Sequence, residues 1–325
     1  MVNLTICTNA PDTTPSDAGV AGSGVLLAFI ITAGIALILS SYIVLGDFRT
    51  NAPIAPKIIS RKLLSSFSDQ QIIEGIGIQA VGLAKMNTMV PYHFFIVWML
   101  ALLSTATHLA TLLTLVQDYK RDWVLRWLRQ FFMFVNLLLN VLYGIFVLET
   151  NIKDLTPTLP IACVWNEHAE DAGAQGNKTL SVVGTIAVIA ITVVLFVLST
   201  WYLHMRRQTW GKAVRAVGLL VLAALAIGAA VRVILASAAF GTPSVKLTGP
   251  REDSWSFGQL LTVLVLILPF ISALEIFRGE IGVSQETVSE DSQPLNGSEL
   301  KPMRYDRYSY QPNPIFGSGS KAFRR

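Results

Sequence analysis

The side chains that could do chemistry in this sequence are polar groups embedded in long apolar segments. The strongest candidates are Gln79, His108, Asn136 and Asn140. His108 lies ten residues from Asp118, and Asn136 lies ten residues from Arg126, so each sits roughly 15 Å along a helix from a charged end. That depth is close to the middle of a bilayer, where polar groups usually face the protein interior. We expect the four side chains to form one polar cluster.

Two interpretations of this cluster are open. As interhelical hydrogen bonds, its members would stabilise the bundle by about 0.6 kcal/mol per contact. Alternatively, the cluster binds a lipophilic molecule, or the imidazole of His108 acts as a general base that Asn136 orients. Glu74 is the only carboxylate well inside an apolar segment, and this scarcity of acids counts against catalysis. Arg232 either extends its guanidinium to the membrane surface or pairs with an acid or an anionic ligand.

Metal and cofactor chemistry is not expected. The chain has four histidines. His93 and His108 are too far apart to share a metal, because fifteen residues of helix span about 22 Å. Residues 257–277 contain no lysine that could form a retinal Schiff base. The glycine patterns that bind phosphates or dinucleotides, and the motifs of common hydrolases, do not occur in the sequence.

The composition points to a membrane as the environment of these residues. Of 325 residues, 52% are hydrophobic and only 14% are charged, whereas soluble domains carry about 25% charge. A soluble fold of this size could not bury so much apolar surface. The same figures exclude a disordered chain, a collagen, a disulfide scaffold and a nucleic-acid-binding protein for the body of the sequence.

Six segments are apolar over the roughly 20 residues that a spanning helix needs: Ala21–Gly46, Tyr92–Val116, Trp127–Leu148, Leu180–Leu203, Ala213–Phe240 and Phe257–Phe277. A seventh, Ser68–Val90, is weaker because polar and charged residues interrupt it, and hydropathy alone would also allow it to lie on the membrane surface. Ser68 or Asp69 is the expected N-cap of this helix. Pro269 is expected to kink the last helix.

Loop charges favour seven spans, with the N-terminus outside and the C-terminus in the cytoplasm. In that arrangement nineteen basic residues fall on the cytoplasmic side and six outside, as the enrichment of Lys and Arg in cytoplasmic loops requires. Six-span arrangements place strongly basic loops outside. The predicted fold is therefore an all-α polytopic membrane helical bundle in the plasma membrane or an endomembrane. It has an outer segment 1–20, a seven-helix domain 21–277 and a disordered cytoplasmic tail 278–325.

The outer side of this arrangement holds both cysteines of the chain, Cys7 and Cys163. An oxidising compartment permits a disulfide between them, and two free thiols are the alternative. The N-glycosylation motif occurs at Asn3, Asn177 and Asn296. Only Asn3 and Asn177 lie outside in the predicted topology, so these two positions are the candidate sites of a glycoprotein.

Four stretches carry a resemblance: residues 68–76 (Ser-Asp-Gln-Gln-Ile-Ile-Glu-Gly-Ile), Tyr92-His93, residues 107–112 (Thr-His-Leu-Ala-Thr-Leu) and residues 123–129 (Trp-Val-Leu-Arg-Trp-Leu-Arg). In these, the first half of the chain resembles a broad, poorly characterised family of multi-pass integral membrane proteins of filamentous fungi. The resemblance implies a fungal membrane protein. It also implies that the weak second segment is a real helix and that His108 has a role. The family has no settled activity, so it implies no reaction.

Three functions fit these observations. The first is a receptor-like membrane protein with no assigned molecular activity, whose partners are the bilayer, a lipophilic small molecule and a cytoplasmic partner of the tail. The second is an intramembrane enzyme acting on a terpenoid or lipid substrate. The third is a transporter or an accessory membrane scaffold, which would need a path through the bundle. Seven spans with an outer N-terminus suit the first, although topology alone is no evidence of signalling.

Overall fold

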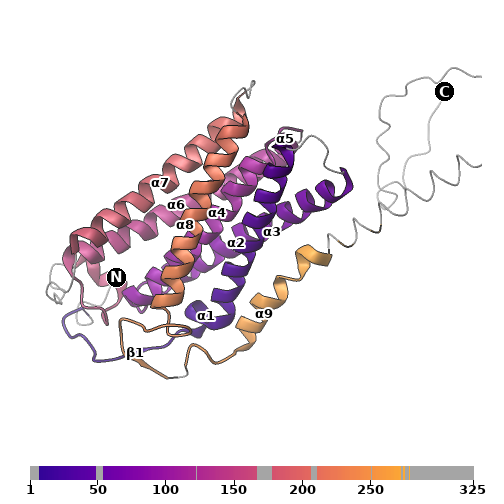
Figure 1. Ribbon diagram of the computed structural model, residues 1–325. Helices are drawn as coiled ribbons and strands as arrows, with labels where there is room; N and C mark the ends of the chain where they lie inside the picture. Colours follow the sequence, from indigo (N-terminus) through magenta and orange to yellow (C-terminus); the bar gives the residue numbers. More distant parts are fainter. Residues whose placement is uncertain are drawn as a thin grey trace, which may run out of the picture. The chain divides into compact units, whose positions relative to one another are not determined.

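The computed structural model describes residues 7–48, 54–121, 123–166, 178–205, 211–249 and 251–271, together with Leu274 and Arg278. These residues are mostly helical (Figure 1). Within them, five helices are long and apolar enough to cross a membrane: Ala18–Asp47, Pro91–Thr114, Arg126–Lys153, Thr179–His204 and Ala213–Ala236. The mostly helical fold expected from the sequence, with helices suited to a membrane, is confirmed. The count of seven spans and the orientation of the termini stay predictions.

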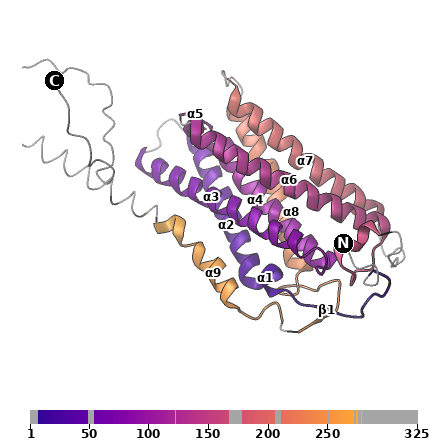
Figure 2. The same cartoon turned by 180° about the vertical axis from the view of Figure 1, so that it is seen from behind.

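In chain order the elements are β1 (Thr14–Pro15), α1 (Ala18–Ala21), α2 (Ser23–Phe48), α3 (Ile54–Ala84), α4 (Pro91–Thr114), α5 (Val116–Arg121), α6 (Trp123–Lys153), η2 (Ile161–Trp165), α7 (Lys178–His204), α8 (Gly211–Ala236), β2 (Leu247–Thr248) and α9 (Phe257–Val265). Successive long helices run in alternate directions (Figure 1). In Figure 2, α3 and α6 lie in front and α8 lies behind them.

Helix α4 is the centre of the bundle and packs against α2, α3, α6, α7 and α8. Every residue from Tyr92 to Thr114 except Phe95 is buried. A helix that is apolar on all sides belongs either in the core of a large protein or in a membrane, and α4 lies in the core of this bundle. Its buried threonines each donate a hydroxyl hydrogen bond to the backbone carbonyl four residues earlier, so they can lie in an apolar interior.

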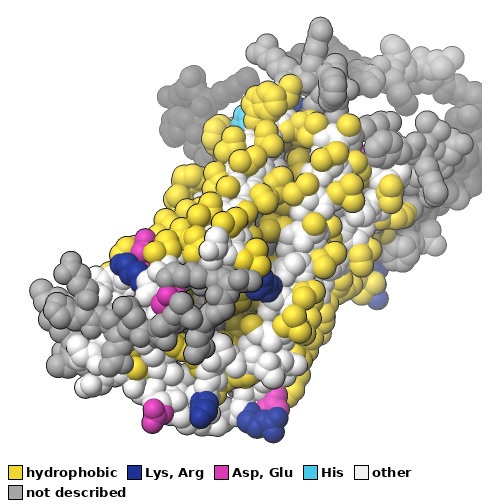
Figure 3. Space-filling model, turned by 60° about the vertical axis from the view of Figure 1, so that its left-hand side comes forward, with side chains coloured by type: hydrophobic (Ala, Val, Ile, Leu, Met, Phe, Trp, Pro, Cys, Tyr) yellow, Lys and Arg dark blue, Asp and Glu magenta, His cyan; other side chains and the backbone are white. Residues whose placement is uncertain are grey.

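The surface of the bundle is apolar where α7 and α8 face outward. Both helices expose large side chains along their length, among them Leu180, Val194, Val197, Leu220, Ile227 and Leu235. Figure 3 shows hydrophobic side chains over most of this flank, with charged side chains gathered at its lower end. A soluble protein rarely exposes a continuous apolar surface of this extent, so the flank is suited to contact with lipid.

One end of the bundle, here called the basic end, is held by ion pairs between helices. The guanidinium of Arg61 in α3 lies 3.2 Å from a carboxylate oxygen of Asp118 in α5. Arg215 in α8 lies 3.0 Å from Asp47 in α2 and also donates to the carbonyl of Thr114 at the end of α4. These contacts join five helices at this end of the bundle.

The opposite end, here called the disulfide end, is tied covalently. Cys7 and Cys163 form a disulfide, as the sequence led us to expect, with an S–S distance of 2.02 Å. The N-terminal segment also pairs in parallel with the segment before α9, through Thr14 opposite Leu247 and Pro15 opposite Thr248. The bridge and the short sheet together fix the N-terminal segment across this end.

The predicted start of α3 is wrong. The helix begins at Ile54, and Ser68 lies within it with its side chain fully buried rather than acting as an N-cap. Phe67, also fully buried, packs edge-on against Phe270, with 5.4 Å between the ring centroids. These tertiary contacts continue the helix through a residue whose local preference is to cap one.

Helix α9 is interrupted where Pro269 predicts a kink. Its regular part ends at Val265, the residue whose carbonyl the proline ring would meet. Beyond it, the backbone N–H groups of Leu266 and Ile267 bond to carbonyls only three residues back. The apolar helix described here, Phe257–Ile271, is shorter than the five spanning candidates.

The disulfide should contribute strongly to stability because it closes a loop of 156 residues. Chain entropy alone would give about 5 kcal/mol, an upper bound because helices that stay inserted in the bilayer already restrict the loop. Cys163→Ser should lower the melting temperature of the purified protein, and Cys7→Ser with Cys163→Ser should lower it no further. Equal melting temperatures for wild type and Cys163→Ser, with both wild-type thiols alkylated without reduction, would contradict the bridge.

Candidate functional site

Three of the four polar residues predicted to cluster are hydrogen-bonded together at the centre of the bundle. The amide Nε2 of Gln79 donates to Oδ1 of Asn136 at 2.8 Å. The amide nitrogens of Asn136 and Asn140 each donate to the hydroxyl oxygen of Thr105, both at 3.1 Å. Gln79, Thr105, Asn136 and Asn140 therefore form a continuous amide network that joins α3, α4 and α6. Sequence reasoning missed Thr105, which differs in no visible way from the other threonines of α4.

Two aromatic residues extend the amide network toward the disulfide end. The indole Nε1 of Trp98 donates to Oδ1 of Asn140 at 2.9 Å, and the hydroxyl of Tyr143 donates to the carbonyl of Gln79 at 2.7 Å. Gly82 permits the second contact, since a Cβ at that position would lie 2.0 Å from the Tyr143 hydroxyl oxygen. A small residue of α3 thus allows a close approach of α6.

His108 is not hydrogen-bonded to the other three. Its side chain is fully buried, and neither ring nitrogen has a hydrogen-bond partner among the described residues. The side chain of Asn136 is engaged by Gln79 and Thr105, so it does not orient the imidazole as a general base would require. The arrangement gives the amide network a structural role and leaves His108 without an assigned one.

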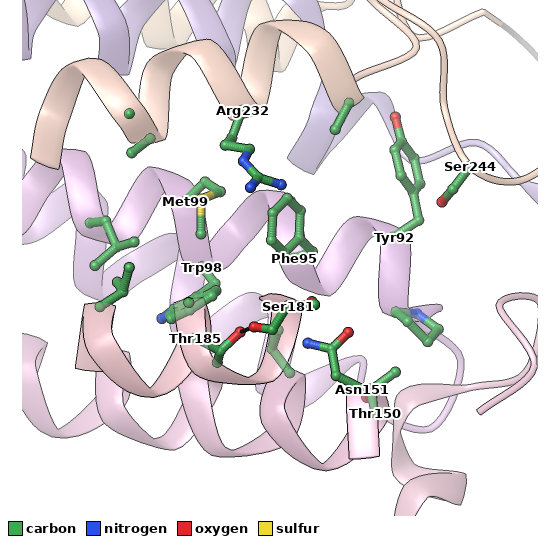
Figure 4. Close-up of a pocket in the computed structure, with 18 of the residues that line it drawn as sticks. Tyr92, Phe95, Trp98, Met99, Thr150, Asn151, Ser181, Thr185, Arg232 and Ser244 are labelled. Atoms are coloured by element: carbon green, nitrogen blue, oxygen red, sulfur yellow. Dashed lines mark hydrogen bonds between the residues drawn. The ribbon is translucent and has the colours of Figure 1, made fainter. Parts of the chain in front are cut away.

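A cavity of about 780 Å³ lies between α4, α6, α7 and α8. Its volume is within the range of about 300–1,000 Å³ that is common for small-molecule sites. Trp98 lines it while bonding Asn140, so the amide network holds one side of the cavity in place. Figure 4 shows Phe95, Trp98 and Met99 of α4 between Arg232 of α8 on one side and Ser181 and Thr185 of α7 on the other.

The polarity of the lining changes along the cavity. Residues near the disulfide end carry most of the polar groups: Tyr92, Thr150, Asn151, Ser181, Arg232, Thr242 and Ser244. Deeper in the bundle the lining is aliphatic, with Leu102, Val188 and Leu225. The ten residues of α4 from Tyr92 to Leu102 span about 15 Å, which sets the depth of this gradient. The cavity therefore matches a molecule with one polar end and one apolar end.

Arg232 extends its guanidinium toward the ring of Phe95 at the cavity (Figure 4). It lies four residues before the end of α8, about 6 Å along the helix. Among the described residues it has neither an ion pair nor a hydrogen-bond partner. Its side chain is exposed, as extension of the guanidinium to the membrane surface requires. Within the second alternative, pairing with an acid is not seen among the described residues, whereas pairing with an anionic ligand stays open.

A buried acid at the disulfide end was missed from the sequence. Glu252 is 1% exposed, and its Oε1 lies 2.6 Å from Nε2 of His93. Its Oε2 accepts a 2.8 Å hydrogen bond from the hydroxyl of Tyr92, which in turn accepts one from the backbone N–H of Ala238. The sequence-based expectation concerned carboxylates inside apolar segments, of which Glu74 is the one; the fold additionally buries Glu252, which lies in a polar loop. No pattern in the sequence marks it.

Several predictions fall on residues outside the described part of the chain. They concern the glycosylation motifs at Asn3, Asn177 and Asn296 and the cytoplasmic tail after Gly279 with its partner.

Comparison with protein-family models, with curated proteins and with solved structures found no match. The likeness to a fungal membrane family accordingly stays a prediction, and function has to be argued from the geometry.

The hydroxyl of Thr105 can be tested against that of Thr107, which is equally buried but bonds only to its own helix. Thr105→Val leaves two buried amide donors without an acceptor and should destabilise the protein by about 1–2 kcal/mol. Thr107→Val should cost less than half as much. Thermal unfolding in detergent micelles measures both variants, and equal losses would show that the amide network adds nothing to stability.

Proposed function

We propose that this chain is a seven-span membrane protein of receptor-like topology that binds a lipophilic small molecule. The cavity between α4, α6, α7 and α8 carries the proposal, since it combines a ligand-sized volume with apolar walls and a few polar groups at one end. The intramembrane enzyme and the transporter are less well supported, because the amide network is engaged internally and His108 does not line the cavity.

Two further helices support a count of seven. Helix α3 packs along α2, α4 and α6, and its buried polar residues, including Gln79, face these neighbours rather than lipid. Helix α9 packs against α2, where Gln259 accepts hydrogen bonds from Ser23 and from the backbone N–H of Gly24. A helix whose polar groups are satisfied internally can lie in hydrocarbon despite its lower hydropathy.

The orientation is supported at both ends. Disulfides persist in oxidising compartments, which favours an outer location for the disulfide end, and basic residues favour a cytoplasmic location for the other. Tryptophans are exposed at each end as well. Trp123, Trp127 and Trp201 lie at the basic end, and Trp165 and Trp255 lie at the disulfide end. Such aromatic belts mark the two interfaces of a membrane with water.

Seven spans with an outer N-terminus put the two chain ends on opposite faces of the membrane. In sealed, right-side-out vesicles, protease should remove an N-terminal tag and leave a C-terminal tag intact. A tag inserted at residues 206–210 should be protected like the C-terminal one. A six-span protein with the same N-terminus would expose the C-terminal tag, and that result would overturn the count.

Occupation of the cavity can be tested with two glycines. A Cβ at Gly228, which lines the cavity, or at Gly77, which lies on the exposed face of α3, would meet nothing within 4 Å. Gly228→Leu should therefore fill the cavity without disturbing the fold, while Gly77→Leu is the matched control. A neutral photoactivatable fatty alcohol in lipid nanodiscs should label peptides of α4, α7 and α8 in the wild type and in Gly77→Leu.

Labelling of those peptides in Gly228→Leu should fall at least several-fold, at an unchanged melting temperature. Equal labelling of wild type and Gly228→Leu would mean that the alcohol binds elsewhere on the apolar surface, and would remove the support for a ligand site.

A further inference from the structure

Arg232 carries the only charge among the described residues that line the cavity. A guanidinium beside aromatic and aliphatic walls is costly unless an anion or water accepts its hydrogen bonds. Carboxylates and phosphates are its preferred partners, because their oxygen spacing matches its two parallel N–H groups. The chemistry at this end of the cavity therefore selects for an oxyanion.

A buried acid at the polar end is already engaged. Both carboxylate oxygens of Glu252 are occupied, one by Nε2 of His93 and the other by the hydroxyl of Tyr92. These contacts hold the carboxylate against Tyr92 and His93 of α4. Among the described residues no acid pairs with Arg232, so its exposed guanidinium is open to water or to the anionic group of a bound molecule.

The rest of the cavity fits an apolar tail. From Arg232 the lining of α8 passes through Ala229, Gly228 and Leu225 to Ala224, eight residues or about 12 Å toward the bundle centre. Leu102 of α4 and Val188 of α7 lie opposite at the deep end. A head group at Arg232 would thus lie near the end of the helices, with its tail parallel to them, as lipids lie in a leaflet.

The cavity is also accessible from the apolar flank. Helices α7 and α8 both pack on α4 rather than along each other, and Gly184 and Gly228 face open space between them. Both glycines are exposed. Since the surface around them is hydrophobic (Figure 3), an amphiphile already in the bilayer could enter sideways without crossing water.

We propose that the cavity binds a single-chain amphiphile with an anionic head group, in which Arg232 holds the oxyanion and α4, α7 and α8 enclose the tail. This inference rests on the proposed ligand-binding function and names its ligand class. The oxyanion is either the carboxylate of a fatty acid or the phosphate of a single-chain phospholipid, which share the chemistry that Arg232 recognises.

The test compares three probes with the same tail in phosphatidylcholine nanodiscs: lauric acid, lauryl phosphate and dodecanol. At least one of the two anions should bind the wild type about tenfold or more tightly than dodecanol. Arg232→Gln should weaken that anion by about 10- to 100-fold, as expected for loss of a charge-assisted hydrogen bond, and leave dodecanol unchanged. Arg232→Lys should restore most of the affinity, and Arg251→Gln, a change at an exposed arginine paired with Asp253, should have no effect.

The preferred anion identifies the source, since tighter binding of lauric acid assigns a fatty acid and tighter binding of lauryl phosphate assigns a single-chain phospholipid. Equal binding of all three probes, or an unchanged affinity of Arg232→Gln for both anions, would overturn the anionic ligand. Ligand binding itself would still stand if Gly228→Leu blocked all three probes. Should Gly228→Leu bind every probe as the wild type does, the ligand site and its anionic preference would both be wrong.

Discussion

The hydroxyl of Thr105 is the contact on which the centre of this bundle depends. It accepts hydrogen bonds from the amides of both Asn136 and Asn140, and its own proton goes to the carbonyl of Ala101. One short side chain of α4 thereby fixes two successive turns of α6. In hydrocarbon no water can replace these partners, so the helices have to meet where donors and acceptors coincide. Gln79 brings α3 to the same point through Asn136.

The position of the cavity follows from this arrangement. Trp98 is held by Asn140 on its polar edge, which leaves the rest of the indole to line the space between α4 and α7. At the other end of the cavity Tyr92 is held by Glu252 and by the backbone of Ala238. Two aromatic side chains that line the cavity, six residues apart on α4, are thus fixed by hydrogen bonds to other parts of the chain. A site lined in this way is organised before any ligand binds, which reduces the entropy lost on binding.

Much of the helical architecture could be predicted from the sequence, because the length of an apolar segment and the charges that flank it are local properties of the chain. Five of the predicted spans correspond to helices that are long and apolar enough to cross a membrane, and Pro269 interrupts α9 as expected. The distance of a residue from the end of its helix is also a nearly local property, since it follows from counting the residues between them. Counting gave similar depths for His108 and Asn136 and led to a predicted cluster that included Gln79 and Asn140, and the three amides of that cluster are connected. It could not show which way each side chain turns, and so it grouped His108 with them.

The features that were missed all depend on residues distant in the sequence. Ser68 does not cap a helix because Phe67 packs on Phe270, and Glu252 is buried because the chain returns from β2 to cover Tyr92 and His93. The cavity at Arg232 exists because α7 and α8 both pack on α4. By itself the sequence determined that this chain forms long helices apolar enough to cross a membrane, since suitability for lipid depends on the composition of each segment. Tertiary structure alone decided which polar groups are satisfied and which, like Arg232, are left to a ligand, because hydrogen bonds form only between atoms that the fold brings within about 3 Å.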